Sequence, residues 1–479
     1  MNRLLISAAH KSSGKTTLSI GLCAALRARG HVVQPFKKGP DFIDPMWLSL
    51  AAGRDCHNLD FYLMGHDEIR RTFAMRSQGA DIAIIEGNKG LYDGLSLDGS
   101  NSNAALAALL QTPVVLVIDA RGMTRGIAPL ILGYQAFDRD VNIAGVILNQ
   151  LGGSRHEAKL RAVIEHYTSV RVLGAVHYDE NLAIIERHLG LMPSNEAAGA
   201  RSRIDAIAAQ VADSVDLDNL MAVAKQAPAL PPPPSPSFPL PQAGEGSEPS
   251  ALRATTIRLG VARDAAFAFY YPGDLEALRA AGAELVFIDT LKDPALPPVD
   301  ALLIGGGFPE VFMEQLEANA SLRREIRQAI ESGMPAYAEC GGLMYLSRSL
   351  SWDGKRCEMV GVIPGDTVMH RRPMGRGYVL LRETGKGLWP LPPNTPAEIR
   401  AHEFHYSSLE NLPPGLVYAY EVLRGTGVDG KHDGIVHKNL LGCYTHLRDL
   451  EGNHWAERFV KFVRTQQRGA NRPQAARST

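Results

Sequence analysis

The chain has 479 residues, of which 45% are hydrophobic and 21% are charged, and its formal net charge is −1. This length exceeds what one ordinary hydrophobic core holds, so we expect two or three domains. The balanced charge excludes a global field that would attract nucleic acid or an anionic membrane. No apolar run approaches the roughly 20 residues of a membrane helix, and no targeting segment is recognisable. The five cysteines are scattered without metal-type spacing, which indicates a reducing, cytoplasmic setting.

Residues 1–224 have the pattern of alternating strands and helices. Continuous apolar runs predict strands buried on both faces, at 3–8, 82–86, 113–119 and 144–149. The stretches 15–30 and 102–110 between them predict helices. This alternation is typical of an α/β domain with a parallel sheet, in which ligand-binding loops lie at the carboxyl ends of the strands.

The first strand leads into a phosphate-binding loop. Residues 8–17, AAHKSSGKTT, match the P-loop pattern except that Ala9 stands at the place of its first glycine. Backbone N–H groups of such a loop wrap a β-phosphate at a helix N-terminus, while Lys15 would bridge phosphates and Thr16 would bind Mg²⁺. Lys11 lies one place after the signature lysine of partition-type regulatory ATPases, which disfavours that alternative function. The candidate nucleotide-binding residues are Ser12, Ser13, Gly14, Lys15, Thr16, Thr17, Lys37 and Asn149.

Acidic residues follow two of the predicted strands in this half. Asp41 and Asp44 come shortly after Lys37, and Glu86 ends a buried strand just before a glycine. Carboxylates at strand ends suit metal-bound phosphate and an anionic substrate, so we expect Thr16, Asp41 and Glu86 to hold a metal ion. The alternative for each aspartate is a cap or a turn, which aspartate readily forms. Candidates for contacting or activating the substrate are Phe42, Asp44 and Asp93.

A proline-rich segment divides the chain. Residues 231–241, PPPPSPSFPLP, cannot pack as a helix or an inner strand and are typical of a semi-rigid spacer. We therefore expect a first domain at 1–224, a linker at 225–255, a second domain at 256–466 and a disordered tail at 467–479. The second domain repeats the alternation, with strands expected at 257–262, 285–288, 301–304 and 335–338, and antiparallel strands near 377–381 and 442–445.

A cysteine on a sharp turn marks the second domain. Residues 335–346, PAYAECGGLMYL, predict a strand, a glycine-flanked turn at Cys340 and the first turn of a helix. The helix N-terminus favours a thiolate, which is the nucleophile that acyl chemistry needs. Backbone N–H groups of Gly306, Gly307 and Gly341 could form an oxyanion hole beside it.

The residues alone leave the base for this cysteine open. His446 follows a predicted strand, where it could face Cys340, but His402 and His405 compete for the role. Three other cysteines are expected to be ordinary small buried side chains, namely Cys23, Cys56 and Cys443.

Together these motifs resemble the cobyrinate a,c-diamide synthase family of glutamine-dependent tetrapyrrole amidases over nearly the whole chain. The matching segments are 13–17, 39–45, 186–191, 262–272, 305–310, the Cys340 turn and 402–407. The resemblance implies two α/β domains, an N-terminal P-loop domain similar to dethiobiotin synthetase and a C-terminal triad-type (class I) glutamine amidotransferase domain. It also implies ATP, Mg²⁺ and glutamine as cosubstrates, a carboxylated tetrapyrrole as acceptor, Cys340 as nucleophile and His446 as its base.

The implied reaction amidates the a and c acetates of cobyrinate or hydrogenobyrinate through an acyl phosphate and ammonia from glutamine. The assembly that we consider for this protein is a homodimer. Arg448 stands where many amidotransferases have a glutamate two residues after the histidine, so His446 must be oriented by another group. Phe42 stands where the family often has tyrosine, and the loops at 88–92 and 99–103 look closer to relatives that amidate sirohaem or nickel-sirohydrochlorin. Sirohaem amidation is therefore the alternative within the family.

Overall fold

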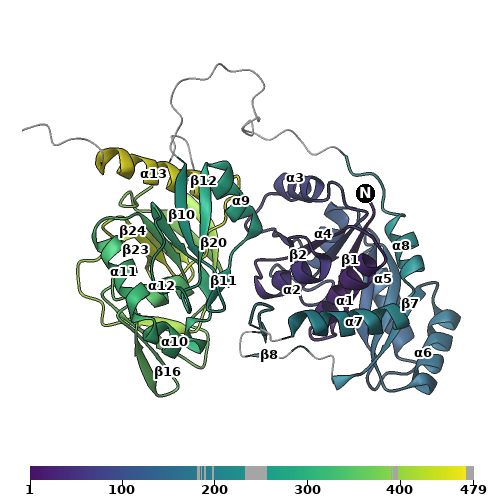
Figure 1. The fold of residues 1–479 in the computed structure, drawn as a ribbon. Coiled ribbons are helices and arrows are strands. Elements are labelled where there is room, and N and C mark those ends of the chain that lie inside the picture. The colour runs from purple at the N-terminus through teal and green to yellow at the C-terminus, as the bar shows by residue number, and fades with distance from the viewer. Residues whose placement is uncertain are drawn as a thin grey trace, which may run out of the picture. The chain divides into compact units, whose positions relative to one another are not determined.

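The computed structural model describes residues 1–180, 184, 186–187, 190–196, 199–231, 256–389, 391 and 397–470. The chain divides into two compact units, Met1–Leu240 and Pro241–Thr479 (Figure 1). Residues 232–255, which make up most of the predicted linker, lie outside the described residues, as do residues 471–479 of the predicted tail. Among the described helices, none is both long enough and apolar enough to cross a membrane.

The first unit is built on a seven-stranded sheet in the order β3-β2-β4-β1-β5-β6-β7, and all of its strand pairs are parallel. Its strands are β1 (Arg3–Ala8), β2 (Val33–Lys38), β3 (His57–Leu59), β4 (Ile82–Glu86), β5 (Val114–Asp119), β6 (Ile143–Leu151) and β7 (Arg171–His177). Its helices are α1 (Lys15–Ala28), α2 (Ile43–Ala52), α3 (His66–Arg76), α4 (Asn103–Leu109), α5 (Ile127–Phe137), α6 (Ser154–Tyr167), α7 (Ala200–Ser214) and α8 (Leu217–Ala224). A short antiparallel pair joins β8 (Glu186–Arg187) to β9 (Gly190–Leu191).

The apolar runs of the sequence become the centre of this sheet. Every residue of β1 and β4 is buried, because helices cover both faces of a parallel sheet. Helices α1 and α7 pack closely because α1 has a glycine, Gly21, where they meet. A Cβ at Gly21 would lie 2.5 Å from Val211 Cγ2 on α7. The parallel α/β fold predicted from the alternation of strands and helices is confirmed.

The second unit contains a nine-stranded mixed sheet in the order β12-β10-β13-β15-β24-β23-β22-β19-β20. Its strands are β10 (Ile257–Ala262), β12 (Ala283–Ile288), β13 (Ala301–Ile304), β15 (Ala336–Glu339), β19 (Gly375–Glu383), β20 (Glu398–His405), β22 (Val417–Arg424), β23 (His432–His437) and β24 (Leu440–Cys443). Strand β19 is antiparallel to both neighbours, as expected. Strand β24 is antiparallel to β23 but parallel to β15. The prediction of an antiparallel strand near 442–445 is therefore confirmed for the pairing with β23 and wrong for the pairing with β15.

Smaller elements surround this sheet. Strands β11 (Phe267–Phe269) and β14 (Gly306–Gly307) form a pair, and a four-stranded sheet has the order β17-β16-β18-β21. The strands of the latter are β16 (Ser349–Trp352), β17 (Lys355–Glu358), β18 (Asp366–Met369) and β21 (Ser407–Glu410). The helices are α9 (Pro272–Ala280), η2 (Pro309–Val311), α10 (Met313–Ala318), α11 (Ala320–Glu331), α12 (Gly341–Leu346) and α13 (Trp455–Ala470).

The last helix, α13, corrects the predicted domain end. The composition predicts a disordered tail from residue 467, but α13 continues to Ala470 and so includes residues 467–470. Trp455, Phe459 and Val463 are buried at helical spacing, and the Trp455 ring packs against Tyr337 of the sheet with centroids 5.1 Å apart. This buried apolar face holds the helix, and its regular backbone then extends beyond the last core contact.

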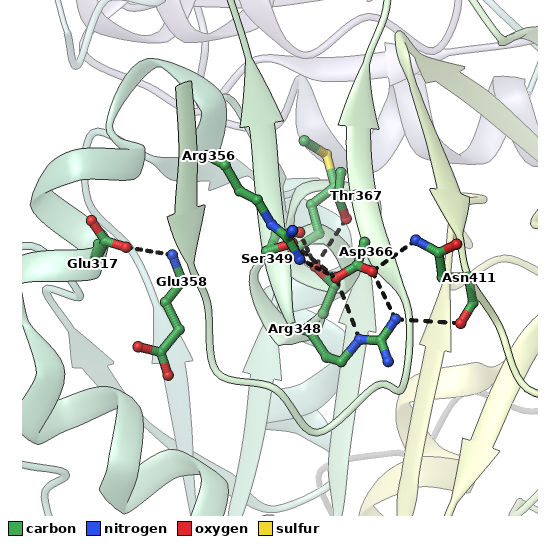
Figure 2. Close-up of polar contacts among 10 residues, drawn as sticks. Glu317, Arg348, Ser349, Arg356, Glu358, Asp366, Thr367 and Asn411 are labelled. Carbon is green, nitrogen blue, oxygen red and sulfur yellow. Dashed lines mark hydrogen bonds and ion pairs between the residues drawn. The ribbon is translucent and has the colours of Figure 1, made fainter. Parts of the chain in front are cut away.

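A polar cluster ties the four-stranded sheet together around Asp366 (Figure 2). Its carboxylate accepts hydrogen bonds from Arg348 at 2.7 Å, Ser349 at 2.9 Å, Asn411 at 3.0 Å and Arg356 at 3.2 Å. Burial alone would raise the pKa of Asp366, but the bonds from Asn411, Arg348 and Ser349 outweigh it and lower that pKa to about 2. The cluster therefore stabilises this sheet through an ionised carboxylate.

Candidate active sites of the two units

Cys340 lies on a strained turn between a strand and a helix. It follows β15 and is the N-cap of α12, with φ 48° and ψ −104°, and a positive φ is uncommon for a residue other than glycine. The turn is tight because α12 packs closely on β13, where a Cβ at Gly342 would lie 2.1 Å from the Ile304 carbonyl oxygen. Only 5% of Cys340 is exposed. This geometry is that of a nucleophile elbow, in which backbone strain presents the reactive side chain.

The structure places His446 beside Cys340. The ring of His446 is buried, it hydrogen-bonds Cys340, and its Nδ1 lies 3.3 Å from Oε2 of Glu339. Burial opposes a charged imidazole, but the contacts with Cys340 and Glu339 outweigh it and raise the pKa of His446 to about 10. His446 is therefore held as an imidazolium beside the Cys340 thiol, and a neighbouring positive charge is what activates a cysteine nucleophile.

The two competing histidines have different surroundings. His402 of β20 stacks on His446 with ring centroids 4.9 Å apart. Burial, together with the charges of His446 and Arg448, holds the pKa of His402 well below its usual value. His405 stacks on Tyr444 with ring centroids 4.0 Å apart. Of the three histidines, His446 is therefore the one that is placed to exchange a proton with the thiol.

The predicted oxyanion-hole glycines gather around this pair. A Cβ at Gly341 would lie 3.0 Å from the Gly307 backbone nitrogen, and one at Gly306 would lie 2.6 Å from His446 Cε1. Backbone of β14 therefore lies against the turn at Cys340 and the ring of His446. Backbone N–H groups collected in this way can stabilise an oxyanion that forms on a carbonyl attacked by the thiolate.

Segment 262–272, one of those that carry the family resemblance, holds the glycine-rich loop at 305–307 in place. The residue types of this segment did not reveal that role. Tyr270 accepts a hydrogen bond from Gly305 N at 2.8 Å and donates one to the Ala262 carbonyl. Asp264 accepts bonds from Ala266 N and Phe267 N at 2.7 and 3.1 Å. These bonds connect the end of β10 to the loop after β13, which positions Gly306 and Gly307.

The other cysteines are free and buried. Burial raises the pKa of the Cys23, Cys56 and Cys443 thiols, as expected for ordinary core side chains. These thiols therefore lack the activated surroundings of Cys340.

In the first unit, the P-loop links β1 to α1. Ser12 and Gly14 have φ values of 64° and 83°, and Lys15 and Thr16 begin the helix, followed by the half-buried Thr17. Ser13 donates a hydrogen bond to the His10 carbonyl at 2.8 Å. Asn149, near the end of β6, donates from Nδ2 to the Ser13 carbonyl at 2.9 Å. Asn149 therefore holds the loop itself.

Four charged or polar side chains meet beside this loop. Thr16 donates a hydrogen bond to Glu86 Oε1 at 2.6 Å, and Lys37 Nζ lies 3.1 Å from the same oxygen and 2.5 Å from Asp44 Oδ2. Burial disfavours the charged form of Lys37, but Asp44 and Glu86 outweigh it and raise the pKa of Lys37. Burial also raises the pKa of Glu86. The structure therefore brings together Thr16, Lys37, Asp44 and Glu86 from four segments of the chain.

Three other candidates lie at the border of this cluster. Burial and the charge of Asp44 raise the pKa of Asp41 to about 8, and Asp41 Oδ1 accepts a bond from Ile43 N at 2.9 Å. Phe42 is half-buried at the start of α2. Asp93 accepts a bond from Gly90 N at 2.9 Å, which is the turn-forming role considered for it.

A metal ion would fit this cluster if phosphate and water completed its ligands. Glu86 Oε2 is buried and has no hydrogen-bond partner, which is the kind of oxygen that a hard cation would satisfy. Within the described parts of the chain, no group of three His, Cys, Asp or Glu side chains could hold a metal ion by itself. Mg²⁺ normally keeps several waters and nucleotide oxygens, so it does not require such a group.

Comparison with known proteins assigns a family model to each unit. Residues 5–191 match the model described as CobQ/CobB/MinD/ParA nucleotide binding domain, and residues 258–453 match the CobB/CobQ-like glutamine amidotransferase domain. The two matches identify a nucleotide-binding unit that is followed by a glutamine amidotransferase unit.

The chain also matches other proteins along nearly their whole length. A protein from Magnetococcus marinus named cobyrinate a,c-diamide synthase is 47% identical to this chain, and the match covers 96% of this chain and 97% of that protein. A protein of the same name from Methanosarcina acetivorans is 43% identical, and the match covers 94% of this chain and 94% of that protein. Another from Archaeoglobus fulgidus is also 43% identical, and the match covers 96% of this chain and 97% of that protein. The chain therefore belongs to the cobyrinate a,c-diamide synthase family of glutamine-dependent amidating ligases.

Proposed function

We propose that this protein uses ATP and ammonia from glutamine to amidate the a and c acetates of cobyrinate or hydrogenobyrinate through acyl phosphates. The observation that carries the proposal is the presence in one chain of the buried Cys340–His446 pair and of a P-loop beside the Thr16–Glu86 contact. The names of the relatives support the choice of substrate.

The second unit would release ammonia from glutamine. The Cys340 thiolate attacks the side-chain amide carbon, and the oxyanion that forms is stabilised by backbone N–H groups around Gly306, Gly307 and Gly341. His446 gives its proton to the leaving nitrogen, so ammonia departs and a thioester remains. Water then attacks the thioester while His446 removes a proton from the water, and glutamate and the thiolate are released.

The first unit would activate the acceptor. A carboxylate of the macrocycle attacks the γ-phosphate of ATP, which gives an acyl phosphate and ADP. Backbone N–H groups of the P-loop would hold the phosphates, and Lys15 would offset the charge that develops on them. Ammonia then attacks the acyl carbon and phosphate leaves, which yields the amide.

A magnesium ion is part of this proposal. Thr16 and Glu86 would hold it, with the buried Glu86 Oε2 as the available oxygen. When bound, the ion would neutralise charge on the phosphates. Lys37 already supplies a positive charge to Asp44 and Glu86, and it would keep both carboxylates ionised and in place.

Replacing the nucleophile tests the division of labour. Cys340→Ala should abolish amidation driven by glutamine and keep amidation driven by ammonium chloride, with ATP and hydrogenobyrinate as the other substrates and product mass as the readout. Cys357→Ala, at a buried cysteine of the same unit on β17, is the matched control and should keep both activities.

Loss of both activities in a folded Cys340→Ala protein would contradict the division of labour. Parallel reactions with sirohaem in place of hydrogenobyrinate test the acceptor. Amidation of sirohaem alone would replace the proposed substrate and leave the proposed reaction type intact.

A further inference from the structure

The orientation of His446 needs an explanation, because the usual acid is missing from the sequence after it. The residue two places on is Arg448, whose guanidinium carbon lies 4.4 Å from the centroid of the Tyr271 ring. A cation in that position cannot accept a proton from an imidazole. A buried imidazolium without a carboxylate partner would also be costly. Another element must therefore supply the acid.

Glu339 lies where such an acid is needed. It is the last residue of β15, and β15 pairs with β24 so that Glu339 is opposite Cys443. The chain that leaves β24 then crosses the end of β15 within three residues, which brings His446 to Glu339. The distance of 3.3 Å between His446 Nδ1 and Glu339 Oε2 is within hydrogen-bonding range.

The Glu339 carboxylate is itself held in place. Its Oε1 accepts a hydrogen bond from the backbone N–H of Leu447 at 2.9 Å and another from the Tyr337 hydroxyl. Oε2 is thereby directed at His446, and Glu339 is 8% exposed. A carboxylate fixed by two donors on one oxygen can orient a ring with the other.

Three other groups near His446 cannot take this role. Cys340 is hydrogen-bonded to the His446 ring, but it is the reacting group itself. His402 stacks on the ring face, 4.9 Å between centroids, and burial keeps it neutral. Tyr271 contacts His402 Nδ1 at 3.4 Å, beyond that ring. The Glu339 carboxylate, by contrast, lies within hydrogen-bonding distance of His446 Nδ1.

We propose that Glu339, the residue before the nucleophile, is the positioning acid of the glutaminase, a role that rests on the proposed function of Cys340 and His446. Its Oε2 accepts the Nδ1–H of His446, which leaves the other ring nitrogen, Nε2, to exchange the proton with the thiol and with the departing ammonia. The carboxylate fixes the tautomer of His446 and stabilises its imidazolium form in each turnover.

Glutamine hydrolysis by the full chain, measured from pH 6 to pH 11, tests this role in Glu339→Gln. We expect kcat to fall by about 100-fold or more with little change in KM, because the neutral amide no longer fixes the tautomer. The alkaline limb of the kcat profile should move to lower pH, because His446 loses the charge that keeps it protonated. Glu339→Asp retains the charge, so its limb should lie nearer to that of the unchanged protein.

Controls separate this proposal from the proposed function. Glu403→Gln changes another buried carboxylate beside a histidine, 3.5 Å from His405, and should leave the alkaline limb unmoved. Amidation driven by ammonium chloride, with ATP and hydrogenobyrinate, should stay normal in Glu339→Gln and report a folded protein.

The proposal is overturned if Glu339→Gln hydrolyses glutamine within about twofold of the unchanged rate with an unmoved limb. An Asp variant whose limb shifts as far as that of the Gln variant also overturns it. If Glu339→Gln does not fold, Glu339→Asp is compared with the unchanged protein, and a limb that moves well to lower pH despite the retained carboxylate overturns the proposal. The proposed function fails by a different result, glutamine-driven amidation that survives in Cys340→Ala.

Discussion

Replacing Gly306 by alanine should displace the base of the glutaminase without removing any catalytic group. A Cβ at this position would lie 2.6 Å from His446 Cε1 and 3.3 Å from Phe269 Cβ. Ordinary contact begins at 3.4 Å, so the imidazole must move by about 0.8 Å from its place beside Cys340. The φ angle of Gly306 is not among the positive values, so alanine adds no backbone strain, and the N–H of residue 306 remains.

The size of the effect follows from this displacement. A misplacement of about 1 Å can cost about 100-fold in rate, which corresponds to about 2.7 kcal/mol of transition-state stabilisation. We therefore expect kcat for glutamine hydrolysis, measured as glutamate release, to fall by about 100-fold in Gly306→Ala. Amidation driven by ammonium chloride should be unchanged, because it does not require His446.

A second glycine provides the matched control. A Cβ at Gly273, on α9 of the same unit, would meet nothing within 4 Å, so Gly273→Ala should retain normal glutamine hydrolysis. A folded Gly306→Ala protein with the kcat of the Gly273→Ala protein would refute the argument that the absence of a side chain at 306 makes room for His446.

Three further substitutions probe the other contacts. Glu86→Gln should reduce amidation from glutamine and from ammonium chloride alike, because it weakens the contacts to Thr16 and Lys37. Glutamate release should continue, and an equal loss of glutamate release would contradict the assignment of Glu86 to acceptor activation. Asn149→Ala removes the hydrogen bond to the Ser13 carbonyl and should raise KM for ATP by about tenfold, the equivalent of about 1.4 kcal/mol, with KM for glutamine as the internal control. Asp366→Ala should destabilise the second unit by about 1–2 kcal/mol at pH 7, after allowance for solvent screening, and lower its melting temperature by several degrees. Because the folded pKa of Asp366 is lowered from 3.8 to about 2, this stabilisation is present above pH 3.8 and is lost as pH falls towards 2, so the two melting curves should converge in that range.

The turn at Cys340 and the P-loop could be located from the sequence because each depends on neighbouring residues. A strand, a glycine-flanked turn and a helix start occupy consecutive positions at 335–346, and the same holds for 3–17. Burial of the strands was also predictable, since both faces of a parallel sheet require apolar side chains. The end of α13 was not, because its last residues have a polar composition and extend a helix held by buried side chains such as Phe459.

The partners of the reactive groups were decided by the tertiary structure alone. Glu339 and His446 are 107 positions apart and Asn149 and Ser13 are 136 apart, and no local pattern records which strands become neighbours. The signal for Glu339 was nevertheless present, as an acid at the end of a buried strand directly before the nucleophile. The sequence by itself determined that a thiol and a phosphate loop would be presented at strand ends. The order and register of the sheets determined which acid, which base and which amide would hold them, because only folding brings those distant side chains within hydrogen-bonding distance.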